Sequence, residues 1–390
     1  MSEFEIDGHR ITLLRNGEAY FPALLAALAE ARETIYLETY IFADDETGAR
    51  FHEALQQAAR RGVNTHVLLD GFGAADFPHA WARELRAAGV QLLWFRPQIS
   101  WLTLRRERLR RLHRKLVLVD GKVAFIGGIN IINDLPDDGS TDLPRLDYSV
   151  RIEGAAIARS VDAAMRRLWT LISWTNFRSR GDRERIPTLP LAPTSTPLSL
   201  VVRDNLRHRS DIEQAYLNEI WRAQDEIIIA NAYFLPGYAF RSALLEARKR
   251  GVRVVLLLQG RVDHRLQHYA SLSLYGQLLK GGIEIFQYHA SFLHAKVAVI
   301  DRQWATVGSS NIDPFSLWLA REANLLVRDA SFAEALRDDL QAHIRSGAHA
   351  VRLSAWGSLG LWPRFLMRAS YILVRALVGL TGYMRRTDRI

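Results

Sequence analysis

Runs of apolar residues alternate along the chain with stretches in which apolar and polar residues are mixed. The runs at residues 227–230 and 254–258 are apolar at every position, as in strands that are buried on both faces of a sheet. The mixed stretches between such runs are long enough for helices that cover those faces. The pattern therefore predicts an α/β fold.

The predicted elements occur twice in the same order. Three segments of the first half resemble three segments of the second: residues 27–42 and 219–234, 58–73 and 246–261, and 87–95 and 280–288. Each half is predicted to run helix, strand, helix, strand, helix, strand and then a pair of strands. We therefore expect two copies of one α/β unit.

A proline-rich segment lies between the two copies. Residues 186–199 hold four of the twelve prolines of the chain together with several Ser and Thr residues, which is typical of a linker. We therefore expect a first half at residues 1–185 and a second half at residues 200–348. The remaining residues, 349–390, form a basic C-terminal segment.

The strand pair of each half carries the same polar residues. Five positions recur 181 residues later in one register: His113 and His294, Lys115 and Lys296, Asp120 and Asp301, Gly127 and Gly308, and Asn130 and Asn311. A structural explanation exists for single residues, since Asp120 and Gly121 are typical of a two-residue hairpin turn. The second copy keeps Asp301 but has Arg302 in place of the glycine, which argues that turn formation alone does not explain the repeat.

These residues suit chemistry on a phosphodiester. Residues two apart on a strand point to the same face, so His113 and Lys115 project together, as do their counterparts. If the halves pack around a pseudo-two-fold axis, both pairs meet in one cleft. Ammonium and amide groups hold phosphate oxygens, while one imidazole attacks phosphorus and the other protonates the leaving group. No cluster of metal ligands accompanies the motif, so we expect neither a metal nor a cofactor.

The pattern H-x-K-x4-D-x6-G-[GS]-x-N, present twice, resembles the signature of the phospholipase D superfamily. The segments ETYIF, VLLDGFG, LHRK, FIGGIN and WATVGSSNIDPFSL are more narrowly similar to those of bacterial cardiolipin synthases of the B type. The resemblance covers roughly residues 10–345. It implies duplicated phospholipase D-like αβα domains with pseudo-two-fold symmetry and one shared active site.

The resemblance also implies a covalent, two-step transfer. One histidine forms a phosphatidyl-histidine intermediate and releases glycerol from phosphatidylglycerol; the other then deprotonates the terminal hydroxyl of a second phosphatidylglycerol, which gives cardiolipin. The usual order in the family makes His113 the nucleophile and His294 the acid and then the base. Phosphate oxygens would be bound by four residues: Lys115, Lys296, Asn130 and Asn311.

Four carboxylates complete the predicted site. Asp120 and Asp301 belong to the catalytic His-Lys-Asp sets, where we expect them to support the turns rather than touch substrate. A catalytic histidine needs an acceptor for its second ring nitrogen, and Asp147 and Glu322, on the strand after each motif, are the candidates. The alternative is that both are ordinary strand-edge carboxylates. The halves are unequal, because Ser316 follows the second motif without a counterpart after the first.

The charge of the chain indicates a membrane partner. The net charge is +9: residues 351–390 contribute +6 (seven Arg, one Asp) and residues 97–112 contribute +4 (five Arg, one Glu), which leaves about −1 elsewhere. Two Arg-rich segments that also contain Trp and Leu favour an anionic membrane surface over nucleic acid. There is no cysteine, which excludes thiol catalysis, disulfides and Cys-bound zinc and suits a reducing compartment.

Attachment to the membrane is expected to be peripheral. No apolar run reaches the roughly 18 residues that a spanning helix needs, and the acidic N-terminus lacks a secretion signal. On a helix, Arg364, Arg368 and Arg375 lie within about 40° of each other beside apolar residues, which predicts an interfacial helix. The alternative is a helix that packs on the core with its Arg residues in water. The insertion at 97–112 is a second candidate for lipid docking. We expect the protein to bind the cytoplasmic face of the bacterial inner membrane.

Other functions remain open at this stage. The two histidines also suit a phospholipase D-type hydrolase, a transphosphatidylase that uses another alcohol or, less well, a nuclease. Whether the site excludes or admits water decides between transfer to an alcohol and hydrolysis. An inert membrane scaffold is disfavoured because both motifs are complete. The expected partners are phosphatidylglycerol and anionic membrane lipids, without nucleic acid.

Overall fold

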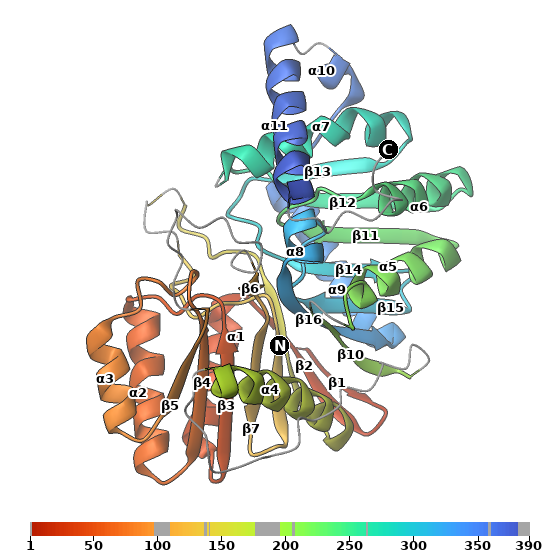
Figure 1. Cartoon of the computed structure of the whole chain (residues 1–390). Helices are drawn as coiled ribbons and strands as arrows, with labels where there is room; N and C mark the ends of the chain where they lie inside the picture. Colours follow the sequence, from red (N-terminus) through yellow and green to blue (C-terminus); the bar gives the residue numbers. More distant parts are fainter. Residues whose placement is uncertain are drawn as a thin grey trace.

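The computed structural model describes residues 2–96, 110–135, 139, 141–175, 196–204, 207–262, 264–357 and 360–380. These residues form two α/β units that meet along one side (Figure 1). The predicted α/β class and the duplication are both confirmed. Among the described helices, none combines the length and the apolar character that crossing a bilayer requires.

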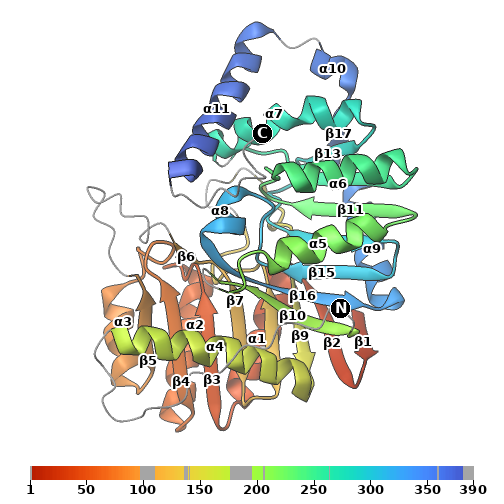
Figure 2. The ribbon, with the colours of Figure 1, turned by 45° about the vertical axis from the view of Figure 1, so that its right-hand side comes forward.

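The first unit is built on a mixed sheet of order β1-β2-β9-β8-β7-β3-β4-β5. Its strands are β1 (Ser2–Ile6), β2 (His9–Arg15), β3 (Thr34–Thr39), β4 (Asn64–Asp70), β5 (Gln91–Phe95), β7 (Lys115–Val119), β8 (Val123–Gly127) and β9 (Tyr148–Glu153). The strands β3, β4 and β5 are parallel to one another, and the others pair antiparallel. Helices α1 (Asn16–Glu30), α2 (Glu46–Arg60) and α3 (His79–Ala87) pack on one face, and α4 (Ala155–Thr175) crosses the other (Figure 2).

The second unit repeats this arrangement in the order β10-β16-β15-β14-β11-β12-β13-β17. Its strands are β10 (Leu198–Arg203), β11 (Glu226–Asn231), β12 (Arg253–Gln259), β13 (Glu284–Tyr288), β14 (Lys296–Ile300), β15 (Trp304–Gly308), β16 (Ala320–Arg328) and β17 (Ala348–Ala350). Helices α5 (Asp211–Arg222), α6 (Tyr238–Lys249) and α7 (Arg265–Lys280) cover the outer face, and α9 (Ala330–Gly347) lies on the inner face. Three short elements, β6 (Arg111–Leu112), α8 (Pro314–Trp318) and α10 (Leu353–Gly357), and the long α11 (Leu361–Leu380) complete the described chain.

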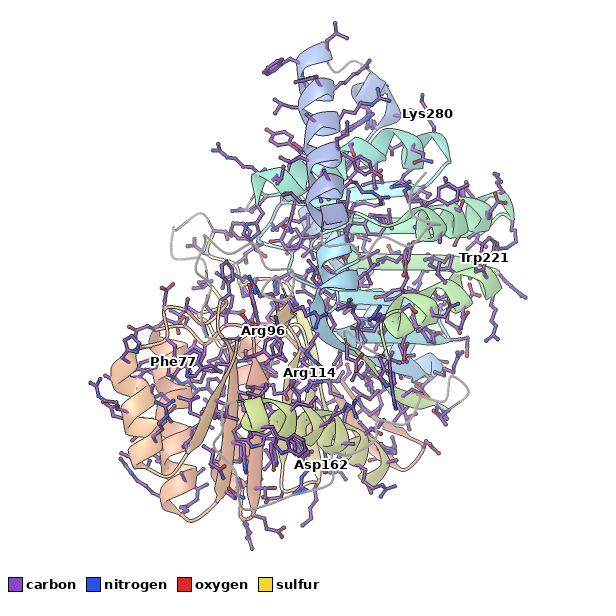
Figure 3. The ribbon with its side chains drawn as sticks, in the orientation of Figure 1. Phe77, Arg96, Arg114, Asp162, Trp221 and Lys280 are labelled. Atoms are coloured by element: carbon purple, nitrogen blue, oxygen red, sulfur yellow. The ribbon has the colours of Figure 1, made fainter. Side chains whose placement is uncertain are left out.

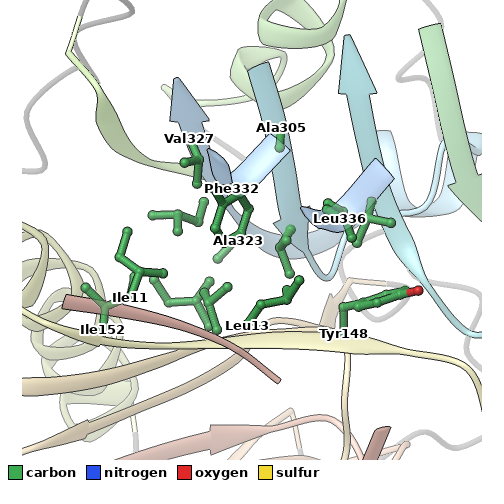
Figure 4. Close-up of a cluster of buried hydrophobic side chains, with 14 of the residues drawn as sticks. Ile11, Leu13, Tyr148, Ile152, Ala305, Ala323, Val327, Phe332 and Leu336 are labelled. Carbon is green, nitrogen blue, oxygen red and sulfur yellow. The ribbon is translucent and has the colours of Figure 1, made fainter. Parts of the chain in front are cut away.

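One apolar cluster joins the two units. Side chains of the first sheet, such as Leu13 and Tyr148, face side chains of the second unit, such as Ala323 and Phe332 (Figure 4). The Tyr148 hydroxyl donates to Asp339 on α9 at 2.6 Å, which adds a polar tie across the same boundary. Because burial of apolar area is the main favourable term in folding, this shared core holds the units in one fixed arrangement.

Two boundaries differ from the expectation drawn from the pattern. Strand β10 begins at Leu198, inside the predicted linker, because its residues are apolar and pair with β16. Strand β17 extends the second sheet beyond residue 348 by pairing with β13. The N-terminal hairpin β1–β2 was absent from the predicted order of elements. Residues 186–195 of the expected linker and residues 97–109 of the expected insertion lie outside the described residues.

Candidate active site

The two predicted histidines lie just before β7 and β14, where the units meet. The backbone N–H of His113 donates to the carbonyl of Arg321 at 2.9 Å, and that of His294 donates to Leu146 at 2.9 Å. Strand β6 also pairs with the start of β16 in the other unit. Each histidine is therefore anchored by the backbone of the opposite unit.

Each histidine ring is bound by a carboxylate from the opposite unit. His113 Nδ1 lies 3.0 Å from Glu322 Oε1, and His294 Nδ1 lies 2.6 Å from Asp147 Oδ2. Both carboxylates are almost fully buried. Since a carboxylate accepts, each Nδ1 carries the proton and each Nε2 keeps its lone pair for chemistry. The structure thus brings all four residues together. In each pair the histidine comes from one unit and the carboxylate from the other, so we call the pairs crossed.

The residue after the first glycine of the motif differs between the two copies, and in each copy it matches the carboxylate that lies next to it. A Cβ at Gly128 would lie 2.4 Å from Asp147 Oδ1, so a side chain there would collide with the carboxylate. The equivalent Ser309 instead donates from its hydroxyl to Glu322 Oε2 at 2.6 Å. The Gly/Ser difference in the two motifs therefore follows the carboxylate that each position contacts. Sequence reasoning missed Ser309, although the variable position of the motif was its signal.

The two motif lysines are buried beside the histidines. Lys115 Nζ donates to the carbonyl of His113 at 2.7 Å, and Lys296 Nζ donates to that of His294. Lys296 Nζ also lies 3.5 Å from Asp147 Oδ2. Each strand begins at the lysine rather than at the histidine, so the predicted i, i+2 relation is between a loop residue and a strand residue.

Burial and the paired charges shift the titration of the site. Burial lowers the pKa of His113, and burial together with Lys296 lowers that of His294 to about 4. Burial, with Lys296 nearby, lowers the pKa of Lys115 to about 7 against the opposing effect of Glu322. Burial alone would raise the pKa of Asp147, but Lys296 and His294 hold it below its usual value. Without a bound phosphate both imidazoles are therefore neutral near pH 7, as a nucleophile must be.

The influence of each lysine reaches the histidine of the other motif. Lys296 lowers the pKa of His113, and Lys115 lowers that of His294. The two motifs therefore share one electrostatic environment. Among the residues that the structure describes, no group of His, Cys, Asp or Glu side chains is arranged to hold a metal ion.

Comparison with known proteins assigns the chain to a family. The sequence profile described as "Cardiolipin synthase, PLD-like domain" matches residues 24–169 and 216–344. The chain belongs to this family. It is 41% identical to the cardiolipin synthase B of Shigella flexneri over 381 residues, which is 97% of this chain and 91% of that protein. It is 32% identical to the cardiolipin synthase A of Pseudomonas fluorescens (strain SBW25), over 84% of this chain and 66% of that protein.

A solved structure shows the same fold at low identity. The phosphatidylserine synthase of Haemophilus influenzae superposes with a TM-score of 0.71 at 15% identity, covering 96% of this chain and 95% of that chain. This likeness confirms the duplicated phospholipase D-like architecture of the family.

The third residue of each family motif lies far from the histidines. Asp120 and Asp301 follow the last residues of β7 and β14, seven residues from the histidines, which is up to about 23 Å at about 3.3 Å per residue. The Asp120 carboxylate accepts from the backbone N–H groups of residues 32–34, and Asp301 accepts from those of residues 224–226, at 2.8–2.9 Å. These contacts hold the start of the neighbouring antiparallel strand, β3 or β11, so neither aspartate touches the reacting groups.

The turns at these aspartates correct one sequence argument. The loops 120–122 and 301–303 both contain three residues, and the first two residues of each have positive φ, of 51° and 61° in the first and 52° and 56° in the second. The expected two-residue turn is therefore wrong, and so is the argument that the loss of the glycine at Arg302 counts against a turn-forming role for the repeated residues. The hydrogen bonds of Asp301 hold the same turn without a glycine.

The two motif asparagines are buried in the site but differ in their contacts. Asn130 Oδ1 accepts from the backbone N–H of Ile41 at 3.1 Å, which leaves its amide N–H groups as donors. Asn311 Oδ1 is buried without a hydrogen-bond partner among the described residues. Ser316 lies on α8, where its backbone N–H donates to Asp313 at 3.1 Å.

Three further residues of this family member support the site and were not predicted. Asp70 accepts from the N–H of Leu112 at 2.7 Å, and Gln259 accepts from the N–H of Leu293 at 3.0 Å, so each fixes the residue before a histidine. The Tyr40 ring packs edge-on against His113, with centroids 4.8 Å apart. A polar residue at the same end of β4 and β12 was the available signal for the first two.

Proposed function

We propose that the chain is a cardiolipin synthase, a phosphatidyltransferase that joins two phosphatidylglycerol molecules into cardiolipin and releases glycerol. The observation that supports this proposal most is the pair of crossed histidine–carboxylate contacts next to two buried lysines. Two imidazoles with free Nε2 atoms match a transfer that needs a nucleophile and a separate acid/base.

In the first proposed step, His113 Nε2 attacks the phosphorus of the donor. The N–P bond forms, the bond to the glycerol oxygen breaks, and His294 gives a proton to that oxygen. Lys115, Lys296, Asn130 and Asn311 bind the non-bridging oxygens, where charge grows in the transition state. The products are phosphatidyl-histidine and free glycerol.

In the second proposed step, the terminal hydroxyl of another phosphatidylglycerol attacks the same phosphorus. The O–P bond forms, the N–P bond breaks, and the hydroxyl proton passes to His294. Cardiolipin leaves with His113 neutral and His294 protonated, as at the start of the cycle. The anionic phosphate of the donor favours the protonated form of His294, because opposite charges within a few ångströms raise the pKa of an imidazole.

The deciding experiment is incubation of the purified protein with phosphatidylglycerol vesicles, followed by analysis of lipid products and released glycerol. We expect about one glycerol for each cardiolipin, from the stoichiometry of the transfer. Phosphatidic acid without cardiolipin would identify a hydrolase of the phospholipase D type instead. If the phosphatidyl group is transferred only to another alcohol that is added to the vesicles, the protein is a transphosphatidylase with a different acceptor.

We also propose that α11 attaches the protein to the anionic cytoplasmic face of the membrane. One side of α11 packs on α7 through Met367 and Val374. Another side exposes large apolar residues, among them Leu361 (86%), Trp362 (69%) and Phe365 (61%). Next to that side run the three predicted arginines, 364, 368 and 375, within about 40° of each other at 100° per residue. An apolar strip with a cationic edge fits an interface between anionic head groups and acyl chains.

A further inference from the structure

A cavity of about 190 Å³ lies beside one of the two histidines. It is lined by Ile41, Ile129, Asn130, Ile132, Asp134, Arg145, Asp147, Tyr233, His264 and His294. His294 is in this lining and His113 is not. The cavity is smaller than the roughly 300–1,000 Å³ of sites for whole small molecules, so it suits a lipid head group rather than an acyl chain.

The chemistry of a double displacement decides what such a cavity holds. The released alcohol and the incoming alcohol both use the acid/base histidine, so both occupy the same place, opposite the nucleophile. Beside His294, that place receives free glycerol first and the terminal glycerol of the acceptor afterwards. The two occupants differ in charge, because released glycerol is neutral and the acceptor carries a phosphodiester on its far carbon.

Arg145 supplies a cation on the wall of this cavity. Its guanidinium donates to the carbonyl of Asn133. The neighbouring Asp134 carboxylate accepts from the N–H of Gly17 at the start of α1, at 2.6 Å, where the helix N-terminus offsets its negative charge. Arg145 also acts on this carboxylate, because its charge opposes the rise to about 6 that burial gives the pKa of Asp134. A guanidinium has five N–H donors, so Arg145 can bind an anionic phosphate as well.

The internal repeat shows that the second unit has no arginine at the position equivalent to Arg145. Gly127 pairs with Ser149 and Gly308 pairs with Asn324, so positions 147 and 322 are equivalent. The residue two positions before each carboxylate is then Arg145 in the first unit and Ala320 in the second. An asymmetric cation fits a reaction in which the two sides of the site receive different groups.

We propose that the cavity is the acceptor subsite and that Arg145 binds the phosphate of the acceptor phosphatidylglycerol. This inference rests on the proposed synthase function and deepens it. Arg145 then acts in the second step alone, and transfer to an alcohol without a phosphate does not need it. It is the residue that makes a phospholipid the preferred acceptor over free glycerol.

The test compares two reactions of the same folded protein. Cardiolipin formation uses the phosphorylated acceptor, whereas exchange of isotope-labelled glycerol into phosphatidylglycerol uses a neutral one. For Arg145→Gln we expect cardiolipin formation to fall at least about tenfold, as for a lost hydrogen bond to a charged group, with glycerol exchange within about threefold of the unchanged protein. Arg145→Lys restores part of the loss. Arg151→Gln, on the same strand region but bound to Glu153, is the matched control and leaves both rates unchanged.

The outcomes separate this inference from the proposed function. An equal fall in both reactions, with a normal melting temperature and circular dichroism spectrum, overturns the acceptor assignment. Unchanged cardiolipin formation in Arg145→Gln overturns it as well. Failure of the unchanged protein to make any cardiolipin, while labelled glycerol still exchanges, counts against the proposed function instead.

Discussion

The crossed histidine–carboxylate pairs set the chemistry at the scale of single residues. Each Nδ1 is held by a buried oxygen, so each Nε2 faces the reaction with a fixed tautomer. Loss of the carboxylate frees the ring to rotate and to change tautomer. The expected consequence is a fall in rate with little change in fold.

We expect Asp147→Asn and Glu322→Gln each to lower kcat by about two to four orders of magnitude, because an amide can present its N–H to Nδ1 and stabilise the wrong tautomer. His113→Ala and His294→Ala abolish turnover. Rates are measured as cardiolipin formed in mixed micelles. His79→Ala, at the exposed start of α3, is the control. Near-normal turnover of either histidine variant would show that the two-histidine mechanism is misassigned.

The pH dependence of kcat/KM should follow the shifted groups of the free protein. The nucleophile His113 reacts in its neutral form, above its pKa, and burial lowers that pKa, so we expect the acidic limb below pH 6.5. A lysine binds phosphate below its pKa, so the value of about 7 for Lys115 places the alkaline limb near pH 7. Initial rates between pH 4 and 9 test both limbs. In Lys115→Arg the alkaline limb should move to higher pH, since guanidinium stays charged. An acidic limb at or above pH 6.5 would contradict the assignment.

The motif residues were predictable because the chain contains its own comparison. His113, Lys115 and their counterparts recur at one constant spacing in the two copies. This recurrence distinguished them from ordinary strand residues. The carboxylate candidates Asp147 and Glu322 also came from their place after each motif. Their exchange between units was not predictable, because it depends on how the two sheets pack. The same holds for Ser309, whose hydroxyl matters only through its distance from Glu322.

At the scale of elements, the sequence of α11 left two alternatives: an interfacial helix, or a helix that packs on the core. The helix packs on α7 and also keeps an apolar side exposed, because its hydrophobic residues are too many for one face. The order of helices and strands followed from apolar periodicity, whereas β10 and β17 were placed by pairing with strands distant in sequence. A short strand at the edge of a sheet has too few residues to show a clear pattern of apolar and polar positions.

The exposed side of α11 should govern binding to vesicles. We expect Trp362→Ser, Phe365→Ser and Ile372→Ser together to weaken binding to phosphatidylglycerol-containing vesicles at least about 30-fold, since each large apolar side chain contributes about 1.5–3 kcal/mol when buried. Deletion of residues 351–390 should weaken binding further. Sedimentation with vesicles measures the effect. The control is Trp221→Ser on α5, which removes another exposed indole from a different surface (Figure 3). Unchanged binding of the triple variant would refute attachment through α11.

At the scale of the whole molecule, the two units form one catalytic body. The central cluster takes side chains from both sheets and from α4 and α9. Arg114, which lies between His113 and Lys115 and is labelled in Figure 3, forms a buried ion pair with Glu38 of β3. It also donates to the carbonyl of Ala164 of α4 at 2.9 Å. Neither unit contains both members of a histidine–carboxylate pair.

Separated units should therefore be inactive. We expect fragments 1–190 and 191–390, expressed apart, to form no cardiolipin, and a co-expressed mixture to regain activity because the apolar cluster drives their association. Cardiolipin assays and analytical ultracentrifugation follow activity and association together. Substantial turnover by either fragment alone would contradict a site shared between units.

The exchange of carboxylates between units also has a consequence during synthesis of the chain. A ribosome-bound chain that has produced His113 has not yet produced Glu322, which comes 209 residues later. The nascent first unit thus displays an imidazole without its orienting group, and it has no partner histidine to complete a transfer. Lipid chemistry can begin only after β16, which carries Glu322, has been synthesised and has docked on the first unit. The crossing of the pairs therefore delays the onset of catalysis until both units have folded together.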